Sequence, residues 1–570
     1  MSWKQIKGIR DRLSQEIGTV YKEWGGRIRV VLAFPNTYYV GMSSLALHTM
    51  YRAFNRFPHV VCERTFWDKE DVEAGHPLLS YESQRPVNEA DVFAFTISYE
   101  MDYFNVTEML RQGRIPLLAE ERESSRQHDG RPWPLIIAGG PAVSMNPEPI
   151  APFFDALVIG EGEEVVETLV GLVEAHREDR SRLLDALAQV PGIYVPTRHV
   201  SDPTHPAFHP IERLWVRDPT LVPPVTAIYT RATEFSNMHL MEIGRGCGRG
   251  CRFCLAGYIY RPPREQPLEV VLEWAREGLQ HTEKIGLVAA AVSDYAHIDT
   301  LAVRLREMGA RISVSSMRTD PISVPLVEAL AASGTRTLTI APEAGSQRLR
   351  DVINKTQQVE DLLAAVDLAE RLRFPQLKLY FMVGHPTERE EDIEALVAFV
   401  KEVRGRFRRT LIINATPFVP KPHTPFQWLP MTPASVIKAR QRRIARALAG
   451  HRVVVRADNP RWAEIQGVLA RGDRRLAPVL AGLERLTPRA FARALEARGL
   501  QMETFLGARD PQAPLPWDIV GVRVKRKYLL REWRLAQQAR VGHHCPPAAK
   551  GCLACGACDP AWAFRATSNE

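Results

Sequence analysis

Short apolar runs alternate with amphipathic helical patterns over the first third of the chain. The helical patterns cover residues 44–57, 103–112 and 163–176. The apolar runs are rich in branched and aromatic side chains, which predicts strands. They cover residues 27–34, 60–66, 91–98, 135–138 and 154–159. This rhythm predicts an α/β fold with a doubly wound parallel sheet over residues 1–176, with its ligand site outside the carboxyl ends of the strands.

The alternation resumes after a linker region, residues 177–237, which is rich in Pro, His and Asp and therefore reads as surface loops. Six further strand patterns follow, separated by helical stretches such as 267–281 and 359–373. They cover residues 239–243, 284–289, 311–315, 335–340, 376–382 and 410–415. The pattern predicts a partial (β/α)6 barrel over residues 238–430, with its active face at the strand ends.

Length and composition fit a chain of several globular domains. With 570 residues, 45% hydrophobic and 25% charged, the chain is too long for one core. No apolar run approaches the ~18 residues that span a bilayer. The N-terminus lacks an apolar segment followed by a cleavage site. We therefore expect a cytoplasmic protein without a membrane partner.

Positive charge is concentrated in residues 431–542, a basic and mainly helical C-terminal region. Residues 431–540 hold 23 Lys and Arg against 9 Asp and Glu, a balance of +14. Since the whole chain carries +8, the remainder carries −6. Such an excess can attract RNA or another anionic macromolecule, although arginine-rich helices also occur as solvated faces.

Three cysteines in the middle of the chain stand at C-x3-C-x2-C spacing: Cys247, Cys251 and Cys254. Glycines at 244, 246, 248 and 250 let the backbone wrap around whatever the sulfurs hold. Thiolates suit a soft metal centre, and three of them leave one position of a cubane cluster open. A zinc site completed elsewhere and simple burial are the alternatives.

A second group of cysteines lies in the tail, residues 543–570. Cys545, Cys552, Cys555 and Cys558 have C-x6-C-x2-C-x2-C spacing. Four thiolates can hold zinc or an iron–sulfur cluster, and the compact C-x2-C-x2-C run resembles ferredoxin loops. The remaining Cys62 reads as a buried strand residue, so the cysteines favour reduced metal-binding thiols over disulfides.

The central cysteine loop resembles the signature of the radical S-adenosylmethionine (SAM) superfamily. The resemblance implies a 4Fe-4S cluster whose open iron binds SAM, which an electron cleaves to a 5′-deoxyadenosyl radical. It also implies that Phe253 lies against the adenine, that Glu343 and Ser346 hold the ribose hydroxyls, and that Lys355 reaches the SAM carboxylate. The turn at 382–388 is similar to a family turn near the adenine, with helix capping as an equal account.

Two turns of the first sheet resemble those of the cobalamin-binding domain in one radical SAM branch. They are Gly139-Gly140-Pro141 and Gly160-Glu161-Gly162-Glu163, so the resemblance implies that these glycines contact cobalamin. The loop at 36–41 lacks the histidine that ligates cobalt in many such domains. Cobalamin without a protein histidine ligand and a domain that has lost the cofactor are both open.

These resemblances imply a radical SAM enzyme, with cobalamin-dependent methyl transfer to an unactivated carbon as the first reading. A radical SAM enzyme without cobalamin that uses the tail as an auxiliary cluster, for sulfur insertion or another modification, is the alternative. An RNA-associated adaptor with structural metal sites is a third. A reductant such as flavodoxin or ferredoxin is the expected partner. No catalytic residue is identified, and Tyr258, Tyr380, His385 and His423 are substrate-side candidates by expected position only.

Overall fold

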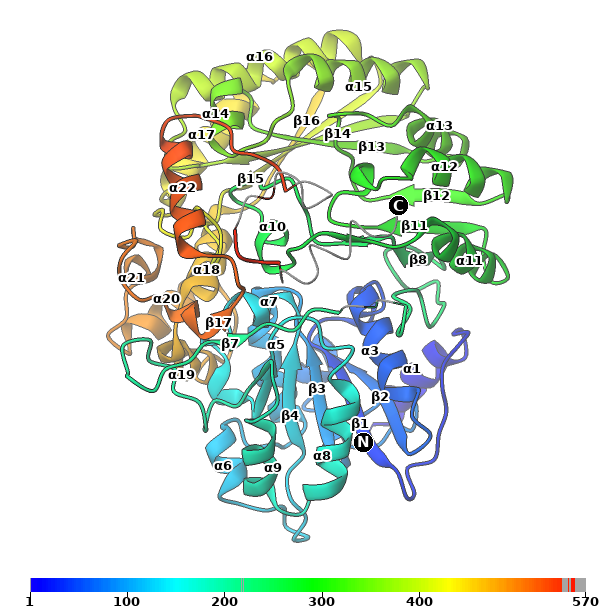
Figure 1. The fold of residues 1–570 in the computed structure, drawn as a ribbon, viewed down its shortest axis with the longest axis vertical. Helices are drawn as coiled ribbons and strands as arrows, with labels where there is room; N and C mark the ends of the chain where they lie inside the picture. The colour runs from blue at the N-terminus through cyan, green and yellow to red at the C-terminus, as the bar shows by residue number, and fades with distance from the viewer. Residues whose placement is uncertain (1, 217, 219, 546–551, 553–554, 559–570) are drawn as a thin grey trace. The chain divides into compact units, whose positions relative to one another are not determined.

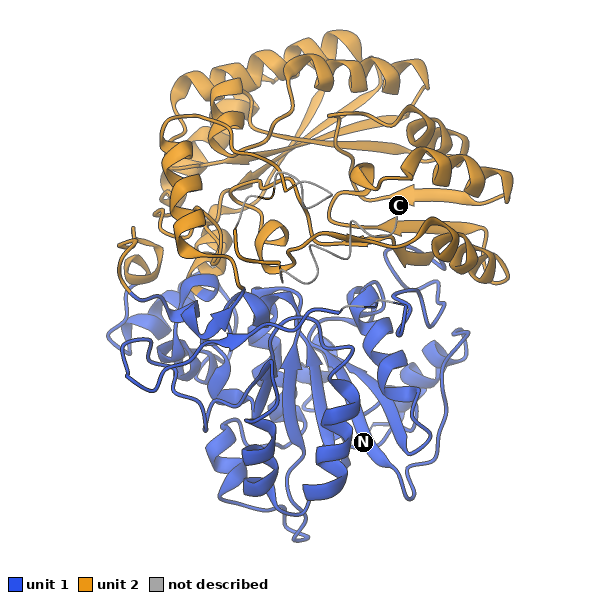
Figure 2. Ribbon diagram, in the orientation of Figure 1, with its two compact units in different colours: residues 1–238, 469–501, 514–522 blue, residues 239–468, 502–513, 523–570 orange. Residues whose placement is uncertain are grey.

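The computed structural model describes residues 2–216, 218, 220–545, 552 and 555–558. The chain divides into two compact units (Figure 2). Unit 1 comprises residues 1–238, 469–501 and 514–522. Unit 2 comprises residues 239–468, 502–513 and 523–570. The basic region expected at 431–542 is therefore divided between both units.

Unit 1 is built on one six-stranded sheet (Figure 1). Its strands lie in the order β2-β1-β3-β4-β5-β6, and all neighbours are parallel except β5 and β6. The strands are β1 (Ile28–Phe34), β2 (Val60–Phe66), β3 (Val92–Thr96), β4 (Leu135–Gly139), β5 (Ala156–Val158) and β6 (Ile193–Tyr194). The predicted parallel α/β arrangement is confirmed, and β6 adds an antiparallel edge strand from within the expected linker.

Amphipathic helices bury the apolar faces of this sheet. Leu47, Tyr51 and Phe54 share one face of their helix and pack into a core with β1 and β2, because residues three to four apart lie on the same side. The helices of this unit that contribute most are α1 (Trp3–Leu13), α3 (Leu45–Asn55), α5 (Tyr103–Gln112), α8 (Val166–His176) and α9 (Arg180–Leu187).

Segments from late in the chain complete unit 1. The Asn146 Nδ2 donates to the carbonyls of Ala470 and Gly472 at 3.1 and 2.8 Å. Phe491, on α20 (Pro488–Glu496), meets Phe104 edge-on at 5.8 Å between ring centroids. The short strands β7 (Ile211–Glu212) and β17 (Val520–Gly521) pair in parallel, and α19 (Ala477–Ala481) packs on α5.

Unit 2 contains two parallel sheets. One has the order β12-β11-β8 and the other β13-β14-β15-β16. A parallel bridge between Met317 and Ile340 links them. The strands are β8 (His239–Glu242), β11 (Lys284–Val288), β12 (Arg311–Val314), β13 (Thr337–Glu343), β14 (Gln376–Val383), β15 (Thr410–Pro417) and β16 (Val453–Ala457). The six predicted strands are present, and β16 is an addition that the sequence analysis did not contain.

Helices follow most strands of unit 2, so the strand ends open into loops at one edge, as alternation requires. The helices are α10 (Ala256–Ile259), α11 (Leu268–Leu279), α12 (Ile298–Glu307), α13 (Val324–Ala332), α14 (Gln347–Val352), α15 (Val359–Arg371), α16 (Glu390–Arg406), α17 (Ala434–Ala447), α21 (Met502–Leu506) and α22 (Arg526–Gln537), and α18 (Pro460–Arg471) ends in unit 1. No helix among the described residues is both long and apolar enough to cross a bilayer.

Candidate functional site

The loop at residues 246–254, which we call the first cysteine loop, carries Cys247, Cys251 and Cys254 directly after β8. Gly246 has φ +81°, and a Cβ there would stand 2.2 Å from the carbonyl oxygen of Tyr260. Only glycine fits this close left-handed turn. The buried Tyr258 hydroxyl donates to the Gly250 carbonyl at 3.3 Å, so this substrate-side candidate supports the loop instead.

Of the three cysteines in the first cysteine loop, Cys251 is buried, and Cys247 and Cys254 are half-buried. None is in a disulfide. Burial raises the pKa of Cys254 to about 12, and the neighbouring charges of Cys251 and Cys247 raise it further. Burial likewise raises the pKa of Cys247. Three thiolates therefore need a cationic centre between them, and this donor set fits an iron–sulfur cluster with one open iron.

The described side chains form no site for a single metal ion. Within the part of the chain that the structure describes, no three His, Cys, Asp or Glu side chains surround one ion position.

Arg318 places a cation beside the first cysteine loop. Its Nη1 lies 3.9 Å from the Cys251 Sγ, and its Nη2 pairs with Asp320 at 2.8 Å. Arg318 is 9% exposed, so water screens the charge little. The sequence analysis missed this residue. Its only signal was a polar stretch just after the predicted strand 311–315.

Glu343 and Lys355 come together at the end of β13. Glu343 has φ +64° at a register irregularity of β13, an uncommon conformation for a residue other than glycine. The Lys355 Nζ lies 3.4 Å from its Oε1, and Lys355 is only 6% exposed. The Lys355 charge also acts on Cys254, although burial dominates the pKa of that thiol. Glu343 and Lys355 thus form a largely buried ion pair, and the Lys355 ammonium is close enough to Cys254 for its charge to act on that thiol.

Phe253 and Ser346 have different surroundings. Phe253 is half-buried and packs on an apolar cluster that includes Ala344, Leu349 and Ile353. The Ser346 hydroxyl accepts from the Leu349 N–H at 3.1 Å as the cap of α14 and donates to Asp392. That hydroxyl is already engaged, so a ribose contact has less support for Ser346 than for Glu343.

The turn after β14 is a buried polar arrangement. The Glu388 carboxylate accepts from the Gly384 N–H at 2.8 Å and pairs with Arg440 at 2.9 Å, while burial raises its pKa to about 7. Burial lowers the pKa of His385 to about 3, and its ring lies 4.9 Å from that of Phe418. His385 is therefore neutral at physiological pH and packs as an aromatic group.

The other two substrate-side candidates lie apart from the cysteine contacts described above. Tyr380 is on β14, with the Lys378 ammonium 4.9 Å from its ring centroid. His423 is buried in the loop after β15, and its backbone N–H donates to Gln427.

The C-terminal helix α22 also holds the first cysteine loop. Arg252, fully buried, pairs with Glu532 on α22 at 3.1 Å and donates to the carbonyl of Arg540 at 2.8 Å. Its Nη1 donates to the carbonyls of Asp351 and Val352. Nothing in the sequence marks this pairing, because its partners are 280 positions apart.

The tail cysteines lie near the same loop. Cys545 is half-buried and its backbone N–H donates to the Gly248 carbonyl at 2.7 Å. Cys555 is buried, Cys558 half-buried and Cys552 exposed. The two cysteine groups that the sequence separates by almost three hundred residues are thus joined by a backbone hydrogen bond.

Four glycines of unit 1 were predicted to contact cobalamin. At two of them, close packing against the backbone already requires glycine. A Cβ on Gly140 would stand 2.5 Å from the Ile97 carbonyl oxygen, and one on Gly160 2.2 Å from that of Leu214. The remaining two, Gly139 and Gly162, would make ordinary contact with Val158. Close chain approach alone therefore accounts for Gly140 and Gly160.

The strand order of unit 1 reverses between β1 and β3, which is the usual ligand position of such sheets. The loops there are joined by Asn36, whose Nδ2 donates to Asp102 at 2.8 Å. Burial raises the pKa of Asp102 to about 7. Tyr39, Val40 and Tyr99, on the same loops, are 46%, 42% and 44% exposed. Large apolar side chains thus face outward at the switch point.

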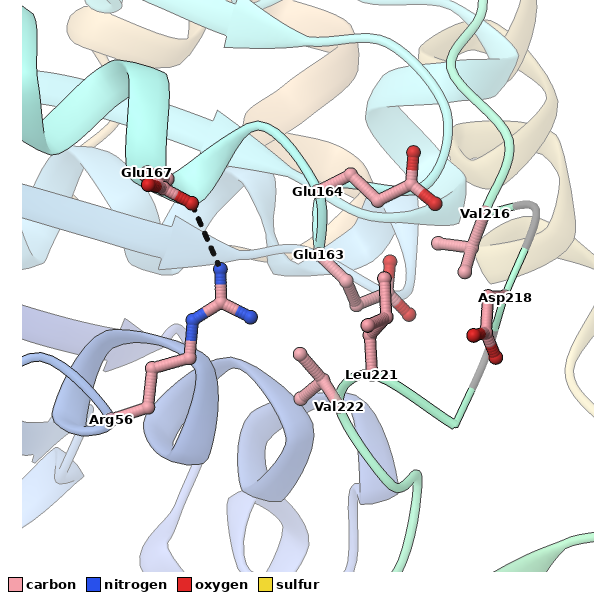
Figure 3. Close-up of a pocket in the computed structure, with 8 residues that line it drawn as sticks. All are labelled: Arg56, Glu163, Glu164, Glu167, Val216, Asp218, Leu221 and Val222. Carbon is pink, nitrogen blue, oxygen red and sulfur yellow. Dashed lines mark ion pairs between the residues drawn. The ribbon is translucent and has the colours of Figure 1, made fainter.

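A pocket lies beside the turn that ends in Glu163 (Figure 3). Arg56 approaches Glu167 at 3.9 Å across it. The remaining lining residues are Glu163, Glu164, Val216, Asp218, Leu221 and Val222. Four carboxylates against one guanidinium make the pocket acidic, which disfavours phosphate groups there.

Two family descriptions match the chain. Residues 46–196 match "Radical SAM proteins, N-terminal", and residues 241–400 match "Radical SAM superfamily". The second match contains the first cysteine loop, Glu343 and Lys355.

Individual proteins extend these matches. An uncharacterized protein of Methanocaldococcus jannaschii, MJ0966, is 33% identical over 79% of this chain and 90% of its own length. The ribosomal protein uS12 methylthiotransferase RimO of an Anaeromyxobacter species is 29% identical over 48% of this chain and 62% of its own length. A further match is the solved structure of the radical SAM methyltransferase TsrM from Kitasatospora setae, with cobalamin and a [4Fe-4S] cluster bound. Its TM-score to this chain is 0.50 and its sequence is 15% identical. The match covers 83% of this chain and 100% of the TsrM chain. That likeness is one of fold.

Proposed function

We propose a function from one premise, which is that this chain belongs to the radical SAM superfamily. Its cofactors are accordingly a 4Fe-4S cluster and SAM. We infer that the enzyme transfers a methyl group to an unactivated carbon with the help of cobalamin. The substrate side of the reaction has no assigned residue.

Unit 2 supports the SAM part of the proposal. A bound 4Fe-4S cluster would supply one electron to SAM, whose sulfonium C–S bond would break to give methionine and the 5′-deoxyadenosyl radical that abstracts hydrogen. Cys247, Cys251 and Cys254 would hold the cluster. Lys355 would neutralise the SAM carboxylate, and Glu343 would accept hydrogen bonds from the ribose.

The observation that carries the cobalamin part is the β1/β3 switch point of unit 1. It combines outward-facing Tyr39, Val40 and Tyr99 with a loop at 36–41 that has no histidine. Exposed aromatic and apolar side chains favour a broad, flat ligand. Cobalt bound there would lack a histidine from this loop, which changes how readily a methyl group leaves.

Methylthio transfer is the second candidate. The relatives named as RimO methylthiotransferases support it, and the tail adds a second group of cysteines next to the first cysteine loop. The two candidates differ in whether cobalamin is required.

The first experiment measures cofactors and SAM cleavage in anaerobically reconstituted protein. We expect 5′-deoxyadenosine on reduction, and loss of it in a Cys247→Ala, Cys251→Ala, Cys254→Ala variant. Cys62→Ala is the control, since Cys62 is buried on β2 in unit 1. Continued SAM cleavage by the triple variant would falsify the assignment.

The second experiment titrates cobalamin by its visible spectrum. Tyr39→Ala with Tyr99→Ala should weaken binding several-fold, while Tyr21→Ala, another exposed tyrosine of unit 1, should not. Electron paramagnetic resonance (EPR) of the cob(II)alamin form should show no coupling to a protein nitrogen. Full activity without cobalamin would leave methylthio transfer as the better proposal.

A further inference from the structure

We propose that Cys545, Cys552, Cys555 and Cys558 hold a second iron–sulfur cluster that is docked against the first cysteine loop. The inference goes beyond the proposed function, because it requires neither cobalamin nor methyl transfer. It rests on described residues of unit 2 alone.

The first step is the docking of the tail. Gly542 and His544 contact the first cysteine loop and its support. Gly542 donates its N–H to the Asn354 side chain at 2.8 Å, and Asn354 in turn donates to the Gly250 carbonyl at 3.0 Å. His544 Nδ1 lies 2.7 Å from the Arg249 carbonyl oxygen. These contacts bring the chain to Cys545 in a fixed position.

Cys545 itself lies against the loop without space between them. Its N–H bonds to the Gly248 carbonyl at 2.7 Å. A Cβ on Gly248 would stand 3.0 Å from the Cys545 carbonyl oxygen, so the two segments are in tight contact and even a methyl group would require a shift of a few tenths of an ångström. Gly248 follows Cys247 directly in the chain. The backbone of Cys247 is therefore linked to that of Cys545 through one residue and one hydrogen bond.

The other end of the cysteine set has an anchor of its own. The Lys525 N–H donates to the Cys555 carbonyl at 2.7 Å. Gly556 has φ +96°, and a Cβ there would stand 2.7 Å from the Arg523 carbonyl oxygen. Residues 523–525 lead into α22, which Arg252 ties to the first cysteine loop. Both ends of the set are therefore positioned by the same unit.

Arg261 gives separate evidence that this place suits an anionic group. Its side chain is fully buried, with the rings of Tyr258 and Tyr528 at 5.2 and 5.3 Å from the guanidinium carbon. Nη1 donates to the Tyr528 hydroxyl at 3.2 Å, but Nε and Nη2 have no hydrogen-bond partner among the described residues. A buried donor without a partner costs about 1–3 kcal/mol, and more when it is charged.

Arg261 contacts the segments that position both cysteine groups, because its Nη1 bonds to Tyr528 on α22. Its Nη2 also lies 3.4 Å from the position of a Cβ on Gly250. Arg261 is thus a buried cation with two unused donors near both cysteine groups. Cluster sulfurs and thiolates are acceptors that would satisfy it.

The spacing favours an iron–sulfur cluster over zinc. Cys552, Cys555 and Cys558 repeat at C-x2-C-x2-C, the run found in ferredoxin loops, and Cys545 supplies a fourth ligand from outside the run. Structural zinc sites usually take their cysteines as two separate pairs. The chain offers a triplet and a single cysteine instead.

Iron and acid-labile sulfide content tests the site. Reconstituted full-length protein should hold about eight irons, as two 4Fe-4S clusters require. Cys552→Ala, Cys555→Ala, Cys558→Ala should leave about four, and so should the triple variant of the first cysteine loop. Cys62→Ala should keep the full content. Iron near four in the unmodified chain, or zinc in place of the second iron quartet, would overturn the proposal.

EPR tests the docking. Two reduced clusters in neighbouring loops should broaden each other's signals, and Gly248→Leu should reduce this coupling because its larger side chain meets the Cys545 carbonyl group. Gly405→Leu, on α16 with no neighbour within 4 Å of an added Cβ, is the matched control. Full iron content with uncoupled spectra in the unmodified protein would contradict docking, as would unchanged coupling in Gly248→Leu.

Discussion

At the scale of single residues, Arg318 has the most direct electrostatic effect on the first cysteine loop. A cation 3.9 Å from the Cys251 sulfur stabilises negative charge, and a cluster gains one negative charge on reduction. Arg318→Gln should therefore lower the reduction potential by some tens of millivolts, where about 59 mV is a tenfold change in a one-electron equilibrium.

Redox titration followed by EPR measures this shift without any turnover. Arg306→Gln, on the exposed side of α12, removes the same charge away from the loop and should leave the potential unchanged. A potential that rises or stays constant in Arg318→Gln would show that Asp320 already cancels the arginine charge.

Lys355 gives the second prediction at this scale. Lys355→Met removes the ammonium proposed to meet the SAM carboxylate, so SAM affinity should fall roughly tenfold, or about 1.4 kcal/mol. Iron content should not change, because Lys355 is not a ligand. Equilibrium dialysis with labelled SAM compares it with Lys401→Met, an exposed lysine of α16. Equal affinities would remove Lys355 from the site.

The sequence anticipated these residues unevenly. Cys247, Cys251, Cys254, Glu343 and Lys355 could be proposed from the sequence because they stand in short motifs or just after a predicted strand, and their roles stay predictions. Arg252, Arg261 and Arg318 could not, since each acts through partners far away in the chain or through burial. Ser346 was assigned a ribose contact on position alone, and its hydroxyl proves to cap a helix. The spacing of a motif predicts residues that act directly on a cofactor. Buried charged residues can be recognised only once the fold shows which partners surround them.

At the scale of elements, the stability of the turns after β1 and β3 depends on whether the Asp102 carboxyl group is protonated. The Asp102 carboxyl group is buried, with Glu100 raising its pKa further and the Asn36 hydrogen bond lowering it. Because its folded-state pKa is about 7, well above the ordinary value of 3.8, its contribution to stability is complete below about pH 4. That contribution decreases as the pH rises towards 7.

Hydrogen exchange of peptides covering residues 92–112 checks this pH dependence. After correction for intrinsic rates, protection should fall between about pH 4 and pH 7, by about 1.4 kcal/mol for each unit of pKa shift that is titrated, and should level off above pH 7. Asp102→Asn should remove most of the dependence, and Asp129→Asn, in an exposed loop, should not. A pH-independent protection in the unmodified chain would contradict a buried carboxyl group with a raised pKa.

Most strands were predicted within a few residues of their ends because they are short, apolar and flanked by turn residues. β2 matches its expected range of 60–66. β16 was missed because its side chains are mostly exposed and lie within the basic region. The helix α22 was expected only as part of a basic helical segment. Its role in holding the first cysteine loop arises from Glu532, which is 2% exposed and pairs with Arg252.

At the scale of the whole molecule, the charge distribution suggests an anionic partner. On α17, Arg440 and Arg443 pair with glutamates, whereas Arg442 and Arg446 are exposed. If RNA binds, retention should fall steeply between about 50 and 200 mM salt, because each neutralised phosphate releases a counterion. Arg442→Gln with Arg446→Gln should weaken retention and flatten the salt dependence.

Filter binding measures this against a control that removes charge elsewhere, Arg304→Gln with Arg306→Gln on α12. Retention that is absent, or equal in both double variants, would favour a protein or small molecule as the substrate. A chain ending at Gly542 separates binding of an anionic partner from metal binding by the tail. It keeps the arginines of α17 and loses the four tail cysteines.

The chain passes between its units several times, and this affects how the protein is made. Residues 1–238 leave the ribosome long before residues 469–522, which supply partners for Asn146 and Phe104 and the strand that pairs with β7. At about 5–20 residues per second, the interval is of the order of tens of seconds. During it the nascent first sheet lacks part of its cover, so chaperone binding should peak in this window. A fragment ending at residue 180 or 238 would remain in that unfinished state permanently.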